Sequence, residues 1–325
     1  KYDILLTKDG SLGRLALVGN EKVCINQSVA VIRPNEKVEP VFLKLLLESP
    51  RYQKQMIEDA GGSTIKHIYI TIVNLMLVGL PSDRVEQRAI ATALSDVDAL
   101  LEGLDQLIAK KRDLKQATMQ QLLTGKTRLP GFEGEWEVKR LGKIFRISAG
   151  SSKSSFIVEG GEYWICDMGS VSTEGRLIVS KRTNYSGDFL HCGDLIMPKD
   201  DIGGGGIIGR VGYIDANETY VLSDHVYRLS PIEGNSLFLA YAINSNEVNS
   251  ALRKKVIGSA QLGLGRRSVE EQEIQFPHPS EQTAIATILS DMDAEIQALE
   301  QRRSKTRDLK QAMMQELLTG KTRLI

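Results

Sequence analysis

Residues Glu86 to Leu129 read EQRAIATALSDVDALLEGLDQLIAKKRDLKQATMQQLLTGKTRL, and Glu281 to Leu324 read EQTAIATILSDMDAEIQALEQRRSKTRDLKQAMMQELLTGKTRL. The two stretches are identical at 30 of 44 positions. Self-similarity at a fixed offset guides the fold prediction before local propensity does. With only two copies at so long a period, the sequence indicates a duplicated domain and not a solenoid.

Apolar residues recur at alternating steps of four and three in both copies, which is the pattern of a coiled-coil seam. Each copy therefore predicts a helix of about 40 residues, or roughly 60 Å. A helix of this length with one apolar stripe needs a similar partner. We expect the two helices to pack together, antiparallel because a whole domain separates them, rather than to lie apart as unrelated surface helices. The expected seam residues are Ile90, Leu94, Val97, Leu101, Leu104, Ile285, Leu289, Met292, Ile296 and Leu299.

Both helices have sequence signals at their ends. Pro81 and Pro279 precede them, and Asp83 with Glu86 predicts a capping box at the first. Gly125 and Gly320 follow Leu-Leu-Thr and predict the carboxyl ends.

The length and composition are those of a globular protein. A chain of 325 residues predicts two or three domains, and 42% hydrophobic residues without a long apolar run predict no membrane helix. Cys24, Cys166 and Cys192 are odd in number and lack metal or disulfide spacing, which favours a reducing cytoplasm. The chain begins at Lys1 without Met, so we expect an internal start.

The regions upstream of the helices also match each other, although more weakly. Asp3-Ile-Leu-Leu-Thr-Lys8-Asp9 is similar to Asp194-Leu-Ile-Met-Pro-Lys199-Asp200, and Gly13-Arg14-Leu15 is similar to Gly209-Arg210-Val211. The stretch from Pro130 to about Cys192 has no counterpart before the first helix. We therefore expect about 60 residues to be missing from the first unit.

These residues together carry a family resemblance. A variable α/β region alternates with a long helix that is introduced by Pro-(x)-Glu-Gln and ends in Leu-Leu-Thr-Gly-Lys, and Trp136 to Gly142 resembles the strand that opens each variable domain. The chain is similar over its whole length to the DNA specificity (S) subunit of Type I restriction-modification enzymes. It departs from the pattern in the incomplete first domain and in two extra residues between Pro81 and Glu86.

The resemblance implies an α+β fold with two α/β target-recognition domains, the first incomplete, separated by two long helices packed as an antiparallel coiled coil. The expected divisions are 1–79 for the carboxyl-terminal part of the first recognition domain, 80–129 for the central conserved helix, 130–276 for the second recognition domain and 277–325 for the distal conserved helix. Each recognition domain would read one half of a split double-stranded DNA target, and the helix pair would set their spacing.

The resemblance also implies partners and the absence of catalysis in this chain. Two methyltransferase (M) subunits and restriction (R) subunits would dock on it. S-adenosylmethionine, ATP and Mg would bind those partners and not this noncatalytic subunit. The whole enzyme would be a restriction endonuclease and adenine DNA methyltransferase in the cytoplasm.

Charge is the main objection to DNA binding. The chain has 41 basic and 41 acidic residues, and residues 130–276 have 16 basic against 19 acidic, so the usual electropositive surface is absent. Contacts must come from local groups at strand ends and in glycine-rich loops. The predicted DNA contacts are Lys8, Arg14, Lys66, His67, Lys153, Lys181, Arg182, Lys199, Gly204, Arg210, Gln261, Arg266 and Arg267. Salt bridges, solvated surface charges or a flexible loop explain the same residues without DNA.

Catalytic and metal motifs fail on inspection. Gly-Lys-Thr occurs at Gly125 and Gly320, but a phosphate loop needs a glycine five residues earlier, where Gln120 and Gln315 stand. The four histidines lack the spacing of metal ligands. Two alternatives stay open: a coiled-coil scaffold that binds only protein, and an enzyme whose active site leaves no recognisable motif.

Overall fold

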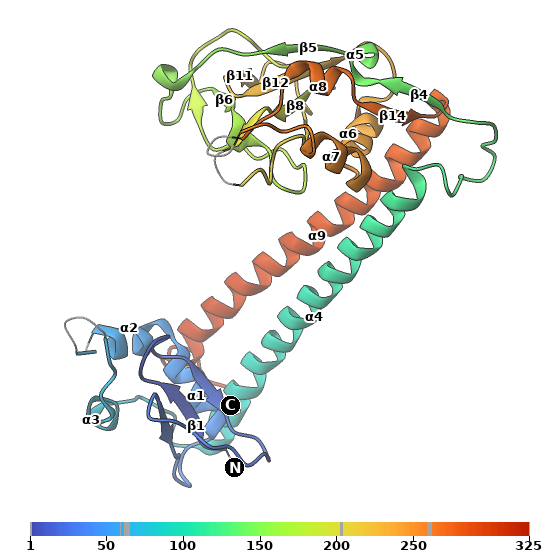
Figure 1. Ribbon diagram of the computed structural model, residues 1–325. Coiled ribbons are helices and arrows are strands. Elements are labelled where there is room, and N and C mark those ends of the chain that lie inside the picture. Colours follow the sequence, from blue (N-terminus) through green and yellow to red (C-terminus); the bar gives the residue numbers. More distant parts are fainter. Residues whose placement is uncertain (1, 59, 62–65, 202–203, 259–261, 325) are drawn as a thin grey trace. The chain divides into compact units, whose positions relative to one another are not determined.

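The computed structural model of the chain describes residues 2–58, 60–61, 66–201, 204–258 and 262–324 (Figure 1). Its contacts divide into two compact units. Unit 1 comprises Lys1–Ala109 and Gln297–Ile325, and unit 2 comprises Lys110–Ile296. Each unit therefore contains one globular region, one part of the first long helix and one part of the second.

The long helices are α4 (Arg84–Leu122) and α9 (Pro279–Leu317), each of 39 residues. Gly125 and Gly320 follow them with φ of +68° and +74°, the left-handed conformation that glycine adopts at a helix end. At the start of α4, the Asp83 carboxylate accepts a hydrogen bond from the Val85 N–H at 2.8 Å. Glu86 does not complete the expected capping box; both of its carboxylate oxygens bind Arg323 instead.

The helices are antiparallel, as expected, and ion pairs define their register. Asp98 of α4 pairs with Lys310 of α9, and Asp105, seven residues later on α4, pairs with Arg303, seven residues earlier on α9. In each helix the acidic members lie nearer the amino end and the basic members nearer the carboxyl end, so a parallel arrangement would place like charges together. The pairs are Asp98–Lys310 at 2.6 Å and Asp105–Arg303 at 2.7 Å in unit 1, and Lys111–Glu295 and Lys115–Asp293, both at 2.6 Å, in unit 2.

The expected seam residues all lie on sheltered parts of the helices. Ile90, Leu94 and Leu104 are buried in α4, and Ile285, Leu289 and Ile296 are buried in α9. Val97, Leu101, Met292 and Leu299 are half-buried. Past these positions the same heptad continues with Ile108, which is buried, and then with polar residues such as Lys115 and Lys310.

Unit 1 holds a three-stranded antiparallel sheet in the order β2-β1-β3. The strands are β1 (Ile4–Thr7), β2 (Leu15–Leu17) and β3 (Val29–Ile32), and the helices are α1 (Pro40–Glu48), α2 (Pro50–Glu58) and α3 (Ile70–Leu75). Its core joins Ile4 and Leu6 of β1 to Phe42 of α1, Leu94 of α4 and Leu317 of α9.

Unit 2 is built on a four-stranded sheet in the order β10-β8-β12-β5, with three smaller sheets, β11-β6-β7, β13-β9 and β14-β4. The strands are β4 (Glu137–Arg140), β5 (Phe145–Ala149), β6 (Tyr163–Cys166), β7 (Arg182–Thr183), β8 (Leu195–Pro198), β9 (Asp200–Asp201), β10 (Gly212–Tyr213), β11 (Tyr220–Leu222), β12 (Val226–Pro231), β13 (Leu262–Gly263) and β14 (Glu273–Phe276). The helices are α5 (Leu141–Ile144), α6 (Ser236–Asn244), α7 (Asn246–Arg253) and α8 (Arg266–Glu270), with 3-10 turns η1 (Ser154–Phe156) and η2 (Met168–Ser170).

The globular regions repeat one arrangement. The order β2-β1-β3 in unit 1 corresponds to β10-β8-β12 in unit 2, and two consecutive helices follow each sheet. Even an ion pair recurs, since Asp3 binds Arg33 at 2.6 Å and Asp194 binds Arg228 at 2.8 Å. In unit 2 the other edge of β12 pairs with β5, whereas β3 has no second neighbour among the described strands.

The repeated Glu-Gln pair at the start of each long helix connects that helix to the globular region of its unit. Gln282 is fully buried, accepts from the Asn235 N–H at 2.8 Å and donates to the Pro277 carbonyl at 2.8 Å. Gln87 is equally buried, accepts from the Glu39 N–H at 2.8 Å and donates to the Pro81 carbonyl at 2.7 Å. Buried backbone groups need such partners, so these glutamines fix where each globular region meets its helix.

The glutamate of each pair binds an arginine that follows the other long helix. Both carboxylate oxygens of Glu281 accept hydrogen bonds of 2.7 Å from the Arg128 guanidinium, and one of them also accepts from the Trp136 indole N–H at 3.0 Å. Both carboxylate oxygens of Glu86 accept hydrogen bonds from the Arg323 guanidinium in the same way. The hydrogen bond from Arg323 lowers the pKa of Glu86, although burial opposes it. The motif residues therefore have a structural function within each unit.

Among the helices of the described residues, none is both long enough and apolar enough to cross a membrane.

Candidate nucleic-acid interface

Several strands of unit 2 end at one edge. In register, Tyr227 of β12 lies opposite Ala149 of β5, and Val226 lies opposite Pro198 of β8. Parallel β6 and β11 end side by side at Cys166 and Leu222. We call the segments that leave these strands, residues 150–156, 167–170, 199–201 and 223–225, the loop edge of unit 2.

The segments of the loop edge pack closely and are joined by hydrogen bonds. A Cβ at Gly150 would lie 2.2 Å from the carbonyl oxygen of Ser223, so only glycine fits there. The Ser223 N–H donates to the Cys166 carbonyl at 2.9 Å, and its hydroxyl accepts from the Lys153 N–H at 3.3 Å. The strands thus position a compact set of polar loops.

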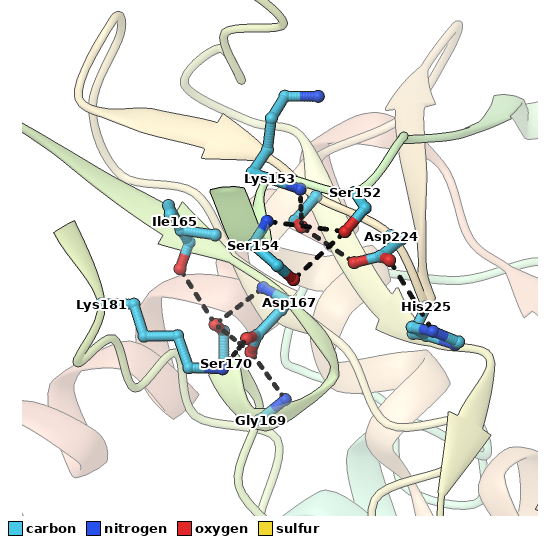
Figure 2. Close-up of polar contacts among 11 residues, drawn as sticks. Ser152, Lys153, Ser154, Ile165, Asp167, Gly169, Ser170, Lys181, Asp224 and His225 are labelled. Atoms are coloured by element: carbon cyan, nitrogen blue, oxygen red, sulfur yellow. Dashed lines mark hydrogen bonds and ion pairs between the residues drawn. The ribbon is translucent and has the colours of Figure 1, made fainter. Parts of the chain in front are cut away.

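Carboxylates organise this set (Figure 2). Asp167 accepts from the Gly169 N–H at 2.9 Å and binds the Lys181 ammonium at 2.5 Å. His225 lies between two acids. Its Nε2 atom lies 3.7 Å from Asp224, the contact drawn in Figure 2, and its Nδ1 atom lies 2.7 Å from Asp200. Partial burial opposes ionisation of Asp224, but hydrogen bonds from Ser223 and Ser152 and the nearby His225 leave its pKa below the ordinary value.

Unit 1 has a corresponding arrangement at the end of its central strand. Lys8 and Asp9 follow β1, as Lys199 and Asp200 follow β8. The Nδ1 atom of His67 bonds the Asp9 carboxylate, and Lys8 lies 3.6 Å from the same carboxylate. The hydrogen bond from His67 holds the pKa of Asp9 below its ordinary value. Lys199 lies 3.9 Å from Asp200, so both units place Lys, Asp and His together.

The structure therefore brings some of the residues predicted to contact DNA next to polar side chains that were not predicted. Lys8 joins His67 in unit 1, and Lys181 and Lys199 lie at or beside the loop edge of unit 2. Sequence reasoning did not select Asp9, Asp167, Asp200, Asp224 or His225 as site residues. The repeated Lys-Asp dipeptide was the available signal for two of them, whereas the histidines reach those aspartates from different sequence positions.

Two predicted cations of unit 2 are engaged inside the domain. Lys153 is 2% exposed, and its ammonium binds Asp188 at 2.8 Å and the Ser151 hydroxyl at 2.8 Å. Arg182 stacks at 3.7 Å over the ring of Trp164 and donates to the Gly161 carbonyl at 2.9 Å. In this conformation Lys153 does not present its charge to the surface.

The remaining predicted contacts are dispersed. Arg266 and Arg267 pair with Glu270 and Glu271, each at 2.7 Å, one turn further along. Arg14 and Lys66 are exposed in unit 1, Gly204 has φ of +91°, and Gln261 lies outside the described residues. Arg210 donates to the Asn244 carbonyl at 2.6 Å.

Neutralisation by neighbouring carboxylates is common among these cations, in keeping with the balanced charge. Non-specific affinity for DNA comes mainly from uncompensated cations that meet phosphates, whereas base reading uses donors and acceptors in a fixed arrangement. The loop edge offers ammonium donors, carboxylate acceptors and a histidine held between two aspartates. Such a surface is better suited to discriminating base edges than to holding DNA by charge alone.

Within the described ranges, no group of three or more His, Cys, Asp and Glu residues has a geometry that could hold a metal ion.

Comparison with known proteins finds consistent similarities. The family described as the Type I restriction modification DNA specificity domain matches residues 1–110 and 133–306. The MjaVIII Type I restriction enzyme specificity subunit of Methanocaldococcus jannaschii is 25% identical over 341 residues, which cover 99% of this chain and 79% of that protein. The MjaIX specificity subunit of the same organism is 27% identical over 169 residues, covering 47% of this chain and 38% of that protein.

A solved structure has a similar fold. The S subunit of a Type I restriction-modification system from M. genitalium superposes with a TM-score of 0.67 at 18% identity, covering 98% of this chain and 83% of that one.

Proposed function

We propose, from the premise that the chain belongs to the Type I restriction modification DNA specificity family, that it reads a bipartite DNA target with its two globular regions. As a member of this family it is a noncatalytic specificity subunit. In our proposal, residues 1–79 contribute to reading one half-site and residues 130–276 read the other. M and R subunits dock on the same chain and supply the chemistry.

The observation that carries the proposal is the duplicated arrangement at the strand ends. Both units place a lysine and an aspartate directly after the central strand and bring a histidine onto that aspartate. Two similar sets of donors and acceptors suit a protein that reads two separate half-sites, while the surrounding residues differ and allow different sequences. The loop edge of unit 2 is the proposed reading surface of the second half-site.

A second duplicated surface supports docking of two like subunits. Arg112 to Ala117 on α4 and Arg307 to Ala312 on α9 have the same sequence, RDLKQA. Leu114 and Leu309, at the same position of this segment, are 52% and 55% exposed. Exposed leucines with the same neighbours in both copies suit two copies of one partner, which we propose to be the M subunit.

The cofactors of the complete enzyme belong to the partners in this proposal. S-adenosylmethionine would bind the M subunits, and ATP with Mg would bind the R subunits. The balanced charge of this chain fits weak binding to DNA on its own, because few uncompensated cations contribute to affinity. The assembled subunits would then supply the remaining contacts to the DNA duplex.

A domain exchange tests the proposal. Residues 130–276 are replaced by the corresponding region of a specificity subunit with another target, and the methyltransferase is reconstituted with M subunits. We expect one half of the methylated sequence to change while the other half and the spacer persist. The matched control exchanges residues 1–79 instead, and should change the other half of the methylated sequence while the first half and the spacer persist.

Two results would contradict the proposal. A change in both half-sites would exclude modular reading. DNA that cross-links to neither globular region in the active complex would favour the alternative of a scaffold that binds only protein.

A further inference from the structure

Unit 2 contains a basic cavity. Its volume is about 510 Å³, within the range of small-molecule sites. The walls are the last turns of α4, the hairpin around residues 173–176, Arg210 and the junction between α6 and α7. Five basic side chains line it, Arg112, Lys115, Lys126, Arg176 and Arg210, against the two acidic side chains Glu174 and Glu247.

Some of this charge is already compensated. The Lys115 ammonium binds both carboxylate oxygens of Asp293, at 2.6 and 2.7 Å, and Arg176 lies 3.4 Å from Glu174. Counting Asp293 with the two lining glutamates, basic groups still outnumber acidic groups around the cavity. An anion entering it would therefore meet a positive field in a partly enclosed space.

Arg210 is the most informative member. One Nη1–H donates to the Asn244 carbonyl at 2.6 Å, but the buried Nε–H has no hydrogen-bond partner among the described residues. Burial and the charge of nearby Arg253 both lower the pKa of Arg210. Arg210 lines the cavity and has a like charge beside it, so an anion in the cavity stabilises its guanidinium.

We propose that this cavity binds a phosphate group, with Arg210 and the basic side chains of α4 as its donors. The guanidinium fork matches phosphate geometry, and an ammonium such as that of Lys126 adds a compact positive charge. The phosphate comes either from a DNA backbone, which would extend the proposed function, or from a free phosphorylated small molecule. The chemistry recognised is the same in both cases.

The duplication provides an internal control. Arg112 of α4 corresponds in sequence to Arg307 of α9, and Lys126, which follows α4, corresponds to Lys321, which follows α9. Arg210 corresponds to Arg14. The hairpin around 173–176 belongs to the stretch without a counterpart in residues 1–79, and Arg14 is exposed. Phosphate binding should therefore depend on Arg210 and not on Arg14.

Titration calorimetry of the complete chain with inorganic pyrophosphate tests this inference. We expect saturable binding by the natural protein and by Arg14→Gln, and at least tenfold weaker binding by Arg210→Gln. Lys126→Ala, which changes an exposed wall residue, should also weaken binding and guards against misfolding of the arginine variant. Absence of saturable binding at millimolar pyrophosphate, or equal loss in Arg14→Gln, would overturn the proposal.

Competition with a DNA duplex distinguishes the two sources of phosphate. If the DNA backbone occupies the cavity, a duplex displaces pyrophosphate, and Arg210→Gln weakens target and non-target duplexes alike while reducing the salt slope by about one. If a small molecule is the ligand, pyrophosphate binds but the duplex does not displace it. Either result supports a phosphate site, and neither depends on the half-site exchange that tests the proposed function.

Discussion

Replacing Gln282 by Met should loosen one globular region while sparing the other. The side chain of Gln282 is completely buried and makes two hydrogen bonds of 2.8 Å, one from the Asn235 N–H and one to the Pro277 carbonyl. Methionine has a similar volume but offers neither a comparable acceptor nor a donor. Gln282→Met therefore removes the hydrogen bonds with little change in packing.

The expected cost follows from the two backbone groups left behind. Each buried polar group that loses its partner costs about 1–3 kcal/mol, so the loss of both partners should cost roughly 2–6 kcal/mol. Because every 1.4 kcal/mol is a factor of ten, local opening should become at least about thirty times more frequent. This loss is a large fraction of the stability of an ordinary domain.

Hydrogen exchange followed by mass spectrometry measures this opening directly. In Gln282→Met, exchange should accelerate in α6 and in the first turns of α9, and α1 should be unchanged. Gln87→Met is the matched control, because Gln87 bonds the Glu39 N–H and the Pro81 carbonyl in unit 1. That variant should accelerate exchange in α1 and the first turns of α4 instead. Equal acceleration of both regions by either variant, or no acceleration at all, would refute the inference that each glutamine stabilises only the globular region of its own unit.

Three further predictions concern the helix pair and the strand ends. Ile296→Asp places a charge at a position 1% exposed and should cost several kcal/mol in chemical denaturation, whereas Leu101→Asp, at a half-buried position, should cost less; equal losses would contradict the observed burial. The Asp9 carboxyl, whose pKa is lowered chiefly by the hydrogen bond from His67, contributes stability fully above the ordinary pKa of Asp and loses it as pH falls through the lowered value. His67→Phe should raise the pKa of Asp9 in a carbon-13 NMR titration and leave that of Asp224 unchanged, and an unchanged Asp9 would exclude the contact. Matched insertions of seven residues after Gln106 and after Gln301 preserve the pairs Asp105–Arg303 and Lys111–Glu295 and lengthen each helix by about 10 Å, or roughly three base pairs of rise. Methylome sequencing should then show the same half-sites with a longer spacer, and an active variant with the natural spacer would remove the proposal that the helices set the distance.

The helices were predictable because their signals are local and are written twice. Repeated apolar positions such as Leu94 and Leu289 define one face of each helix, and Gly125 and Gly320 mark where the helices end. The antiparallel arrangement also had a signal in the sequence, since acidic residues precede basic ones in both copies. The strand correspondence of β1 with β8 followed from the repeated Leu-rich stretch and its Lys-Asp ending.

The partners of charged side chains were not predictable in the same way. Glu86 looks like a capping residue in sequence but binds Arg323 from the far end of the chain. Lys153 looks like a surface cation but is buried against Asp188. Such contacts join residues that are distant in sequence, and a single sequence does not state which carboxylate a lysine or arginine will meet.

The sequence by itself determined the duplication, the two long helices, their shared seam and the family resemblance, because periodic burial and helix ends depend on neighbouring residues. Only the tertiary structure decided that His67 and His225 both reach an aspartate after a central strand, and that the repeated Glu-Gln pair fastens helix to globular region. The physical reason is that a hydrogen bond needs donor and acceptor within about 3 Å, and only chain folding brings such distant residues to that separation.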